Sequence, residues 1–95
     1  MNQKHIRITT NNGNVDHDNQ PLKNGNEEAV WDSGTGESFR VVFRGDCPFD
    51  KNTFDVPAGG SVGSGAPTAN AAEKSYKYDV VGPGGTNDPT IIIQK

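Results

Sequence analysis

Apolar and polar residues alternate in several short segments of this chain, and stretches rich in glycine, proline and asparagine separate these segments. The clearest segment is Ser38–Arg44, in which Phe39, Val41 and Phe43 stand at every second position. A period of two puts successive side chains on opposite faces of an extended chain, as in a strand buried on one side. We therefore predict a strand here, with the two arginines of the segment facing outward.

The last third of the chain is predicted to form a hairpin around which the rest is organised. Tyr76, Tyr78 and Val80 alternate with polar residues, and the run Ile91–Ile93 suits a strand covered on both faces. Between them, Gly82-Pro83-Gly84-Gly85 cannot continue a helix or a ladder, so the chain must turn there. A lone hairpin is not stable in water, so the upstream chain must supply the surface on which it packs.

Further short strands are expected upstream, each ending at a turn signal such as Asn24-Gly25. They are His5–Thr10, Gln20–Lys23, Glu27–Asp32 and the segment with Phe54 and Val56. Pro21 marks the second of these as an edge strand. Asp46–Lys51 is expected to be an irregular loop, and the small, polar segment Ser61–Ala72 a flexible connection across one end.

These elements predict an all-β fold. About seven short strands follow one another at intervals of about 8–12 residues, and no convincing amphipathic helix is present. The natural arrangement is a two-sheet antiparallel sandwich with Greek-key crossing, formed by a single domain over residues 1–95.

Composition narrows the class of protein. Only 31% of the residues are hydrophobic, so the core must be thin, and the formal charge of −3 is mild. The nine basic residues are scattered, which argues against a nucleic-acid partner. No apolar run is long enough to span a membrane, and the first residues do not resemble a signal peptide. We therefore expect a cytoplasmic protein, one exported by a non-classical route, or a trimmed one.

Several segments, taken in their order, resemble the cupredoxins and, more closely, small bacterial cupredoxin-like domains of unassigned function. The segments that carry this resemblance are Val30-Trp31, Phe39–Phe43, Pro48-Phe49 with Phe54, Val56–Gly60, Tyr76–Val80 and Asp88–Ile93. The resemblance covers most of the chain from about Ile6 onward, and it implies a Greek-key sandwich.

The same resemblance argues against the cofactor of the family. A type 1 copper site needs two histidines, one cysteine and a weak axial methionine. The places of the first histidine and the cysteine are held by Phe39 and Val80, and those of the second histidine and the methionine fall near Pro83 and Asp88. All four have lost the ligands of the family, so we expect a copper-free domain with no cofactor.

Two histidines offer a separate metal-binding hypothesis. His5 is expected to be solvated on the outer face of the first strand. His17 lies in an oxygen-rich loop, where Asp16, Asp18 and Gln20 offer ligands to a hard cation. The loop lacks the glycine and the glutamate of a calcium-binding loop, and Asx-turn chemistry explains the same residues.

The remaining side chains are expected to be structural. Trp31 is the central core residue rather than an exposed binding platform. Arg40, Arg44 and Lys77 point outward, as edge protection or as cross-strand partners of Asp79. The acidic pairs Glu27-Glu28 and Asp46/Asp50 lie in or beside turns and are expected to be solvated.

No nucleophile is expected to be activated, so we expect no enzyme. Cys47 is the only cysteine, which rules out an internal disulfide. It either fills a small gap against the core or presents an exposed thiol that can pair with a second subunit. The serines lack the Gly-x-Ser-x-Gly elbow, and no Cys-His-Asn pattern accompanies Cys47.

The first hypothesis for function is a non-catalytic, copper-free binding module for a protein partner, with no small-molecule ligand. Its end loops 32–37, 45–52 and 82–88 would form the recognition surface. The candidate residues in these loops are Ser33, Thr35, Asp46, Cys47, Pro48, Phe49, Pro83 and Asn87. An alternative is a structural subunit that self-associates, as an oligomer or filament, through edge strands near Gln20–Lys23 or Thr90–Lys95. The metal-binding protein remains a third possibility.

Overall fold

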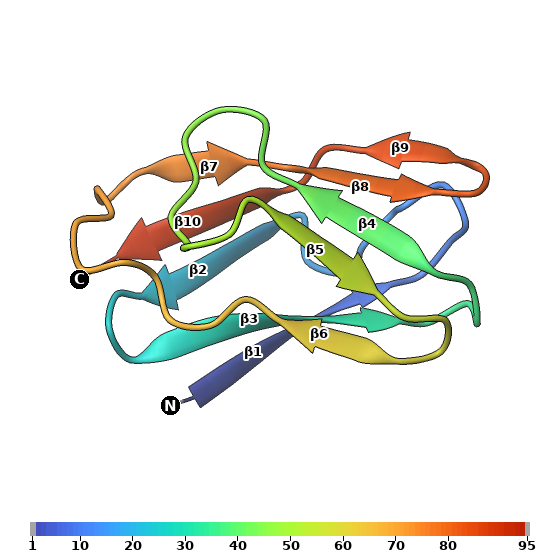
Figure 1. Cartoon of the computed structure of the whole chain (residues 1–95), viewed down its shortest axis with the longest axis horizontal. Helices are drawn as coiled ribbons and strands as arrows, with labels where there is room; N and C mark the ends of the chain where they lie inside the picture. The colour runs from blue at the N-terminus through green and yellow to red at the C-terminus, as the bar shows by residue number, and fades with distance from the viewer. Residues whose placement is uncertain (1, 95) are drawn as a thin grey trace.

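The structure, a computed structural model, describes residues 2–94 and consists of strands and turns (Figure 1). Within these residues ten strands form three hydrogen-bonded sheets, with the orders β1-β3-β6, β2-β10-β7 and β5-β4-β8-β9. The strands are β1 (Asn2–Ile8), β2 (Asn19–Lys23), β3 (Glu27–Ser33), β4 (Phe39–Val42), β5 (Thr53–Val56), β6 (Ser61–Gly63), β7 (Ser75–Lys77), β8 (Asp79–Gly82), β9 (Gly85–Asn87) and β10 (Thr90–Gln94).

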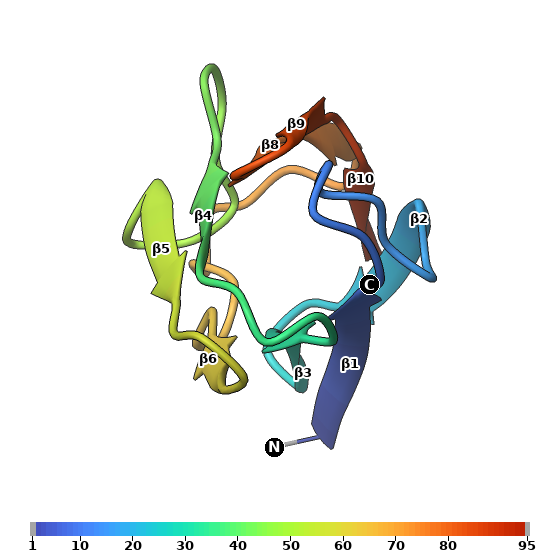
Figure 2. The ribbon, with the colours of Figure 1, turned by 90° about the vertical axis from the view of Figure 1, so that its right-hand side faces the viewer.

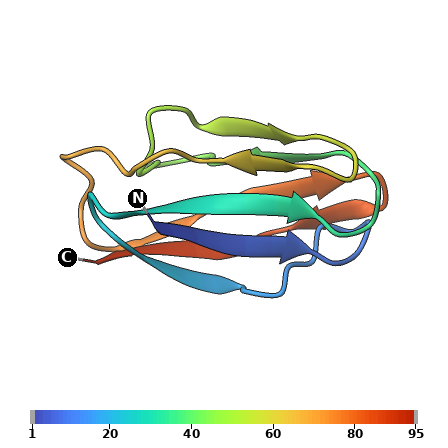
Figure 3. The same cartoon turned by 90° about the horizontal axis from the view of Figure 1, so that it is seen from below.

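The three sheets make two layers. β7 and β8 lie in line and are separated only by Tyr78, so the second and third sheets run into each other (Figure 1). The backbone N–H of Tyr78 donates to the carbonyl of Pro89, just before β10, and holds this junction. The first sheet, β1-β3-β6, forms the other layer (Figure 3). The prediction of an all-β, sandwich-like fold is therefore confirmed.

Two details of the predicted architecture differ. The described chain has ten strands rather than about seven, because the predicted strand over Lys74–Val81 divides at Tyr78 into β7 and β8, and because β6 and β9 form in segments predicted to be a connection and a turn. The pairing is also not purely antiparallel, because β1 runs parallel to β3 and β10 runs parallel to β2. In each parallel pair a connection crosses between the layers before the chain returns, so neighbours in a sheet are not neighbours in sequence.

The C-terminal segment is more complex than the single hairpin that the sequence predicts. β8 turns back at Gly82–Gly85 to form a hairpin with β9, and β10 then pairs antiparallel with β7. β10 lies between β2 and β7. Ile91 and Ile93 point to one face and are buried, whereas Ile92 points to the opposite face and is only half-buried. The expectation of a strand covered on both faces is therefore met on one face only.

The predicted flexible connection 61–72 begins with a strand that sequence reasoning missed. β6 pairs antiparallel with β3, placing Val62 opposite Trp31. Its sequence, Ser-Val-Gly, has only one apolar residue, so a period of two is not detectable. The pairing follows from β3, because Val62 packs on its buried face opposite Trp31. It does not follow from the strand propensity of the β6 sequence.

Trp31 occupies the centre of the core and is fully buried, as predicted. Four aromatic rings surround it with centroids 5.3 to 6.4 Å from its own, and they belong to Phe43, Phe49, Phe54 and Tyr78. Most of these pairs are edge-to-face, the arrangement that ring quadrupoles favour. The chain therefore compensates for its few apolar residues by gathering its aromatic rings around one indole.

Candidate functional site

The sandwich has two flanks where the layers meet edge to edge (Figure 2). On one flank β1 faces β2, and on the other β6 faces β5. Strand edges carry backbone N–H and C=O groups that a partner chain can bind. The two flanks differ in how these groups are occupied.

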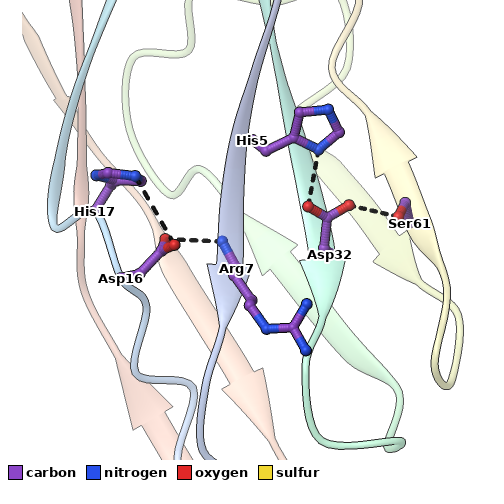
Figure 4. A network of polar contacts seen from close by, with 6 residues as sticks. All are labelled: His5, Arg7, Asp16, His17, Asp32 and Ser61. Carbon is purple, nitrogen blue, oxygen red and sulfur yellow. Dashed lines mark hydrogen bonds and ion pairs between the residues drawn. The ribbon is translucent and has the colours of Figure 1, made fainter.

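On the first flank, Asp16 covers part of the edge of β1 (Figure 4). Its carboxylate accepts from the backbone N–H of Arg7 at 2.9 Å, and its own N–H donates to the carbonyl of Arg7 at 3.0 Å. Both edge groups of Arg7 are thus occupied. Because the backbone groups of successive residues in a strand face opposite sides, Gln3 and His5 also direct their N–H and C=O groups to this edge. The neighbouring exposed side chains of β1 are polar or charged.

The edge of β2 on the same flank is closed by its own side chains. Pro21 has no N–H, and the side-chain amide of Gln20 donates to its carbonyl at 2.9 Å. The carboxylate of Glu27 accepts from the backbone N–H of Lys23 at 2.9 Å, and Asn26 donates to the carbonyl of Lys23. Glu27 is therefore buried and not solvated as expected, because it caps this edge and pairs with Lys4. The prediction that β2 is an edge strand is confirmed.

A chain of polar contacts crosses the outer face of the first sheet (Figure 4). Nδ1 of His5 lies 2.8 Å from one carboxylate oxygen of Asp32, and the hydroxyl of Ser61 donates to the other. These contacts link β1, β3 and β6 across the sheet. His5 is 57% exposed but, contrary to the expectation of a purely solvated ring, it has a partner. The carboxylate stands between the histidine and the serine, so the imidazole does not contact the hydroxyl it would have to deprotonate.

The predicted hard-cation loop is occupied by structural contacts instead. Asp16 binds the backbone of Arg7, and His17 lies 3.8 Å from the same carboxylate. Within residues 2–94 no group of three His, Cys, Asp or Glu side chains is close enough to hold a metal ion.

On the opposite flank the backbone groups of β5 and β6 face outward. The N–H of Phe43 donates to the carbonyl of Asn52 at 2.8 Å, which fixes the phase of the antiparallel ladder between β4 and β5. Because bonded positions alternate, Thr53 and Asp55 direct their N–H and C=O groups away from β4. The bond from Ser33 to Gly60 fixes β6 in the same way, so the groups of Ser61 and Gly63 also point outward.

A hollow lies at this open flank. It has a volume of about 730 Å³ and extends over β4, β5, β6 and β8. Val56, Val62, Val81 and Pro57 give it apolar walls, and the ion pair of Arg40 with Asp55 stands among them. Both members of that pair are largely exposed, so it can rearrange when another chain approaches.

The structure does not bring the three predicted recognition loops together. Segments 34–38 and 83–84 lie at one end of the sandwich, whereas 43–52 lies at the other (Figures 1 and 3). Among the candidate residues, Ser33, Pro48 and Phe49 are buried, Thr35, Cys47 and Asn87 are half-buried, and Asp46 and Pro83 are exposed. A single surface formed by all three loops is therefore not available.

The loop before β5 is held by local contacts. The thiol of Cys47 donates to the carbonyl of Lys51 at 3.2 Å, packs against the core and is free and half-buried. Burial raises the pKa of the Cys47 thiol, although a backbone hydrogen bond at Phe49 opposes this. These contacts agree with the interpretation of Cys47 as a filler against the core.

Charged residues on the strands form pairs, as expected, but with partly different partners. Arg44 pairs with Asp79 as predicted, whereas Arg40 pairs with Asp55 and Lys77 lies near Asp88. Sequence alone gives the outward direction of these side chains. It does not give the register, which places Arg40 opposite Asp55 of β5 and Val81 of β8, whereas Asp79 lies opposite Val42.

Comparison with models of known protein families and with curated proteins finds no match for this chain. In residues 2–94 no helix is long and apolar enough to cross a membrane.

Proposed function

We propose that this chain is a non-catalytic binding module that recognises a protein partner at the flank between β5 and β6. The observation that carries this proposal is the coincidence of an apolar hollow with two strand edges whose backbone groups face outward. Pockets with mostly apolar walls and a few polar groups are the usual places where proteins bind ligands. On the other flank, Pro21, Glu27 and Asp16 occupy much of the corresponding backbone.

The proposal includes a copper-free, cupredoxin-like, Greek-key fold. It is supported by the order of the segments that resemble that family and by the all-β architecture. Phe39 and Val80, which stand at two of the ligand positions of the family, are buried core residues here.

Self-association through edge strands is the alternative function, but two observations weigh against the edges first expected for it. β10 lies between two other strands, so Thr90–Gln94 has no free edge, and Lys95 lies outside the described residues. β2 is an edge, but Pro21 offers no donor and the N–H of Lys23 is occupied by Glu27. A metal-binding function is less well supported, because His5 and Asp32 supply only two neighbouring ligands.

The experiment is a comparison of partner capture by three immobilised forms of the chain: wild type, Val81→Arg and Val42→Arg. Val81 and Val42 are both half-buried, on neighbouring strands of one sheet, but only Val81 lines the hollow. We expect at least one protein to bind wild type and Val42→Arg but not Val81→Arg. Capture of the same proteins by all three forms would contradict the proposed site.

A further inference from the structure

The open flank has the geometry that strand addition requires. In this mode an extended peptide pairs with a sheet edge, its backbone supplying the hydrogen bonds and its alternate side chains the specificity. Thr53 and Asp55 of β5 present up to four outward backbone groups, two donors and two acceptors. A segment aligned with them runs beside the hollow, and its side chain opposite Val56 lies on the same face of the sheet as Val56, which lines the hollow together with Val62.

The hollow suits apolar side chains, and the edges of β5 and β1 do not offer them. On β5 the apolar residues Phe54 and Val56 are already buried in the chain's own core, and the exposed residue is Asp55. On β1 the isoleucines are likewise buried, and the exposed side chains are polar or charged. A second copy that docked by β5 or β1 would therefore have no free apolar side chain to place in the hollow.

The charge of Asp55 indicates which side chains the other face of the bound segment would carry. The side chain opposite Asp55 would lie on the outer face, where the Asp55 carboxylate is 74% exposed and pairs with Arg40 on the neighbouring strand β4. Opposite charges on directly facing cross-strand positions attract each other. A lysine or arginine at that position of the segment would complete a row from the segment through Asp55 to Arg40.

We propose that β5 binds an extended segment of another protein by strand addition, and that the segment alternates apolar residues with basic or polar ones. The inference rests on the proposed function and specifies the chemistry of the partner at the same site. A segment of about four to six residues matches a four-residue strand. Its inward side chains fill the hollow, and its backbone bonds to Thr53 and Asp55.

The test starts from a display library of random linear octapeptides, selected on the wild-type chain. The selected peptides are then titrated by fluorescence anisotropy against Asp55→Pro, Asp55→Ala and Gln3→Pro. Proline removes only an N–H that faces away from β4, so it blocks the free edge and spares the ladder. Asp55→Ala keeps that N–H, and Gln3→Pro removes an equivalent N–H from the edge of β1.

We expect the selected peptides to alternate apolar residues with basic or polar ones and to bind Asp55→Pro at least about tenfold more weakly than wild type. Binding to Gln3→Pro should stay within about threefold of wild type, and loss of the carboxylate in Asp55→Ala should weaken it only severalfold. Circular dichroism shows whether Asp55→Pro is folded. If it is not, methylating alternate peptide nitrogens gives the same information on wild type: one set should abolish binding and the other should not.

Other outcomes would overturn strand addition. If the peptides bind Asp55→Pro as well as wild type but lose affinity for Val81→Arg, the hollow binds a partner and the proposed function survives without strand pairing. If neither variant matters, or no peptide is selected, both proposals fail at this flank. A dimeric wild type that becomes monomeric in Asp55→Pro would assign the edge to a second copy.

Discussion

The indole N–H of Trp31 donates a hydrogen bond to the hydroxyl of Tyr78 at 3.2 Å, in the centre of the core. Trp31 belongs to β3 in one layer, and Tyr78 lies at the junction of β7 and β8 in the other. Both side chains are almost completely buried, so neither polar group can turn to water instead. This bond therefore fixes the position of the two layers relative to each other at the point where one sheet runs into the next.

Removing the hydroxyl in Tyr78→Phe should lower the free energy of unfolding by about 1–3 kcal/mol, because the indole N–H remains buried without an acceptor. Urea denaturation followed by Trp31 fluorescence measures the change. Tyr76→Phe is the matched control, since Tyr76 donates to the carbonyl of Ala72 at a less buried position. We expect it to cost about 1 kcal/mol or less. Equal effects of the two substitutions would contradict the role assigned to Tyr78.

Alkaline pH should destabilise the fold through Tyr78. Burial raises the pKa of the Tyr78 hydroxyl, and nearby Asp18 and Asp16 add to this effect, although the bond from Trp31 opposes it. The folded state therefore keeps its proton where the unfolded chain, with an ordinary pKa near 10, releases it. The stabilisation is fully present below pH 10 and falls above it by up to about 1.4 kcal/mol per pH unit.

Denaturation curves between pH 8 and 11 test this dependence when wild type and Tyr78→Phe are compared. The difference in unfolding free energy between them should shrink above pH 10, because only the wild type loses the contribution of Tyr78. A difference that stays constant over this range would mean that Tyr78 ionises as easily in the folded chain as in the unfolded one.

Much of the fold could be predicted from residues with a clear period of two. The alternation of Phe39, Val41 and Phe43 predicts β4, although the strand itself ends at Val42, and the single tryptophan is the natural centre of so small a core. The break at Tyr78 could not be predicted. Its alternation with Tyr76 and Val80 continues across the break, and only the bond to the carbonyl of Pro89 reveals the change of neighbour. The pairing of the strands could not be predicted for the same reason. Alternation of apolar and polar residues shows which side chains share a face of a strand, but it does not show which strand lies beside it.

Gly13 allows the loop after β1 to pack closely on β8. Its φ of 85° is left-handed, and an added Cβ would collide with the carbonyl oxygen of Val80. Gly25 has a similar φ of 79° but faces open space, so it is a matched control. Gly25→Ala should cost about 1 kcal/mol for the left-handed conformation alone. Gly13→Ala should cost about 3 kcal/mol or more, because the backbone must also move.

Thermal or urea denaturation of the two alanine variants provides the comparison. The excess cost at Gly13 measures the close approach between the loop and β8, since the conformational term is shared. Similar stabilities of the two variants would show that the loop does not pack on β8 as described.

Cys47 should react slowly with a thiol reagent in the folded chain. Its side chain is half-buried and donates to Lys51, and burial raises its pKa, so the reactive thiolate is scarce. We expect Ellman's reagent at pH 8 to modify it at least about tenfold more slowly than in urea. Equal rates would favour the alternative of an exposed thiol, and so would a disulfide-linked dimer under non-reducing electrophoresis.

The candidate site was less accessible to sequence reasoning than the fold. Loops were expected to carry recognition, but the hollow is formed by β4, β5, β6 and β8, and one of these strands was not predicted. Edge closure depends on individual contacts, such as that of Glu27 with Lys23, which the sequence alone presents as an exposed acidic pair. Pro21 was the one signal of a closed edge that could be read directly.

The central claim is that the edge of β5 is open in the isolated chain, and amide hydrogen exchange monitored by NMR tests it most directly. The amides of Thr53 and Asp55 should exchange at rates within about tenfold of an unfolded chain, while Phe54 and Val56 between and beside them are protected. Lys23 should be protected by its side-chain acceptor, Glu27. Protection of Thr53 and Asp55 in a monomer would contradict the account, since another part of the chain would then already occupy the edge.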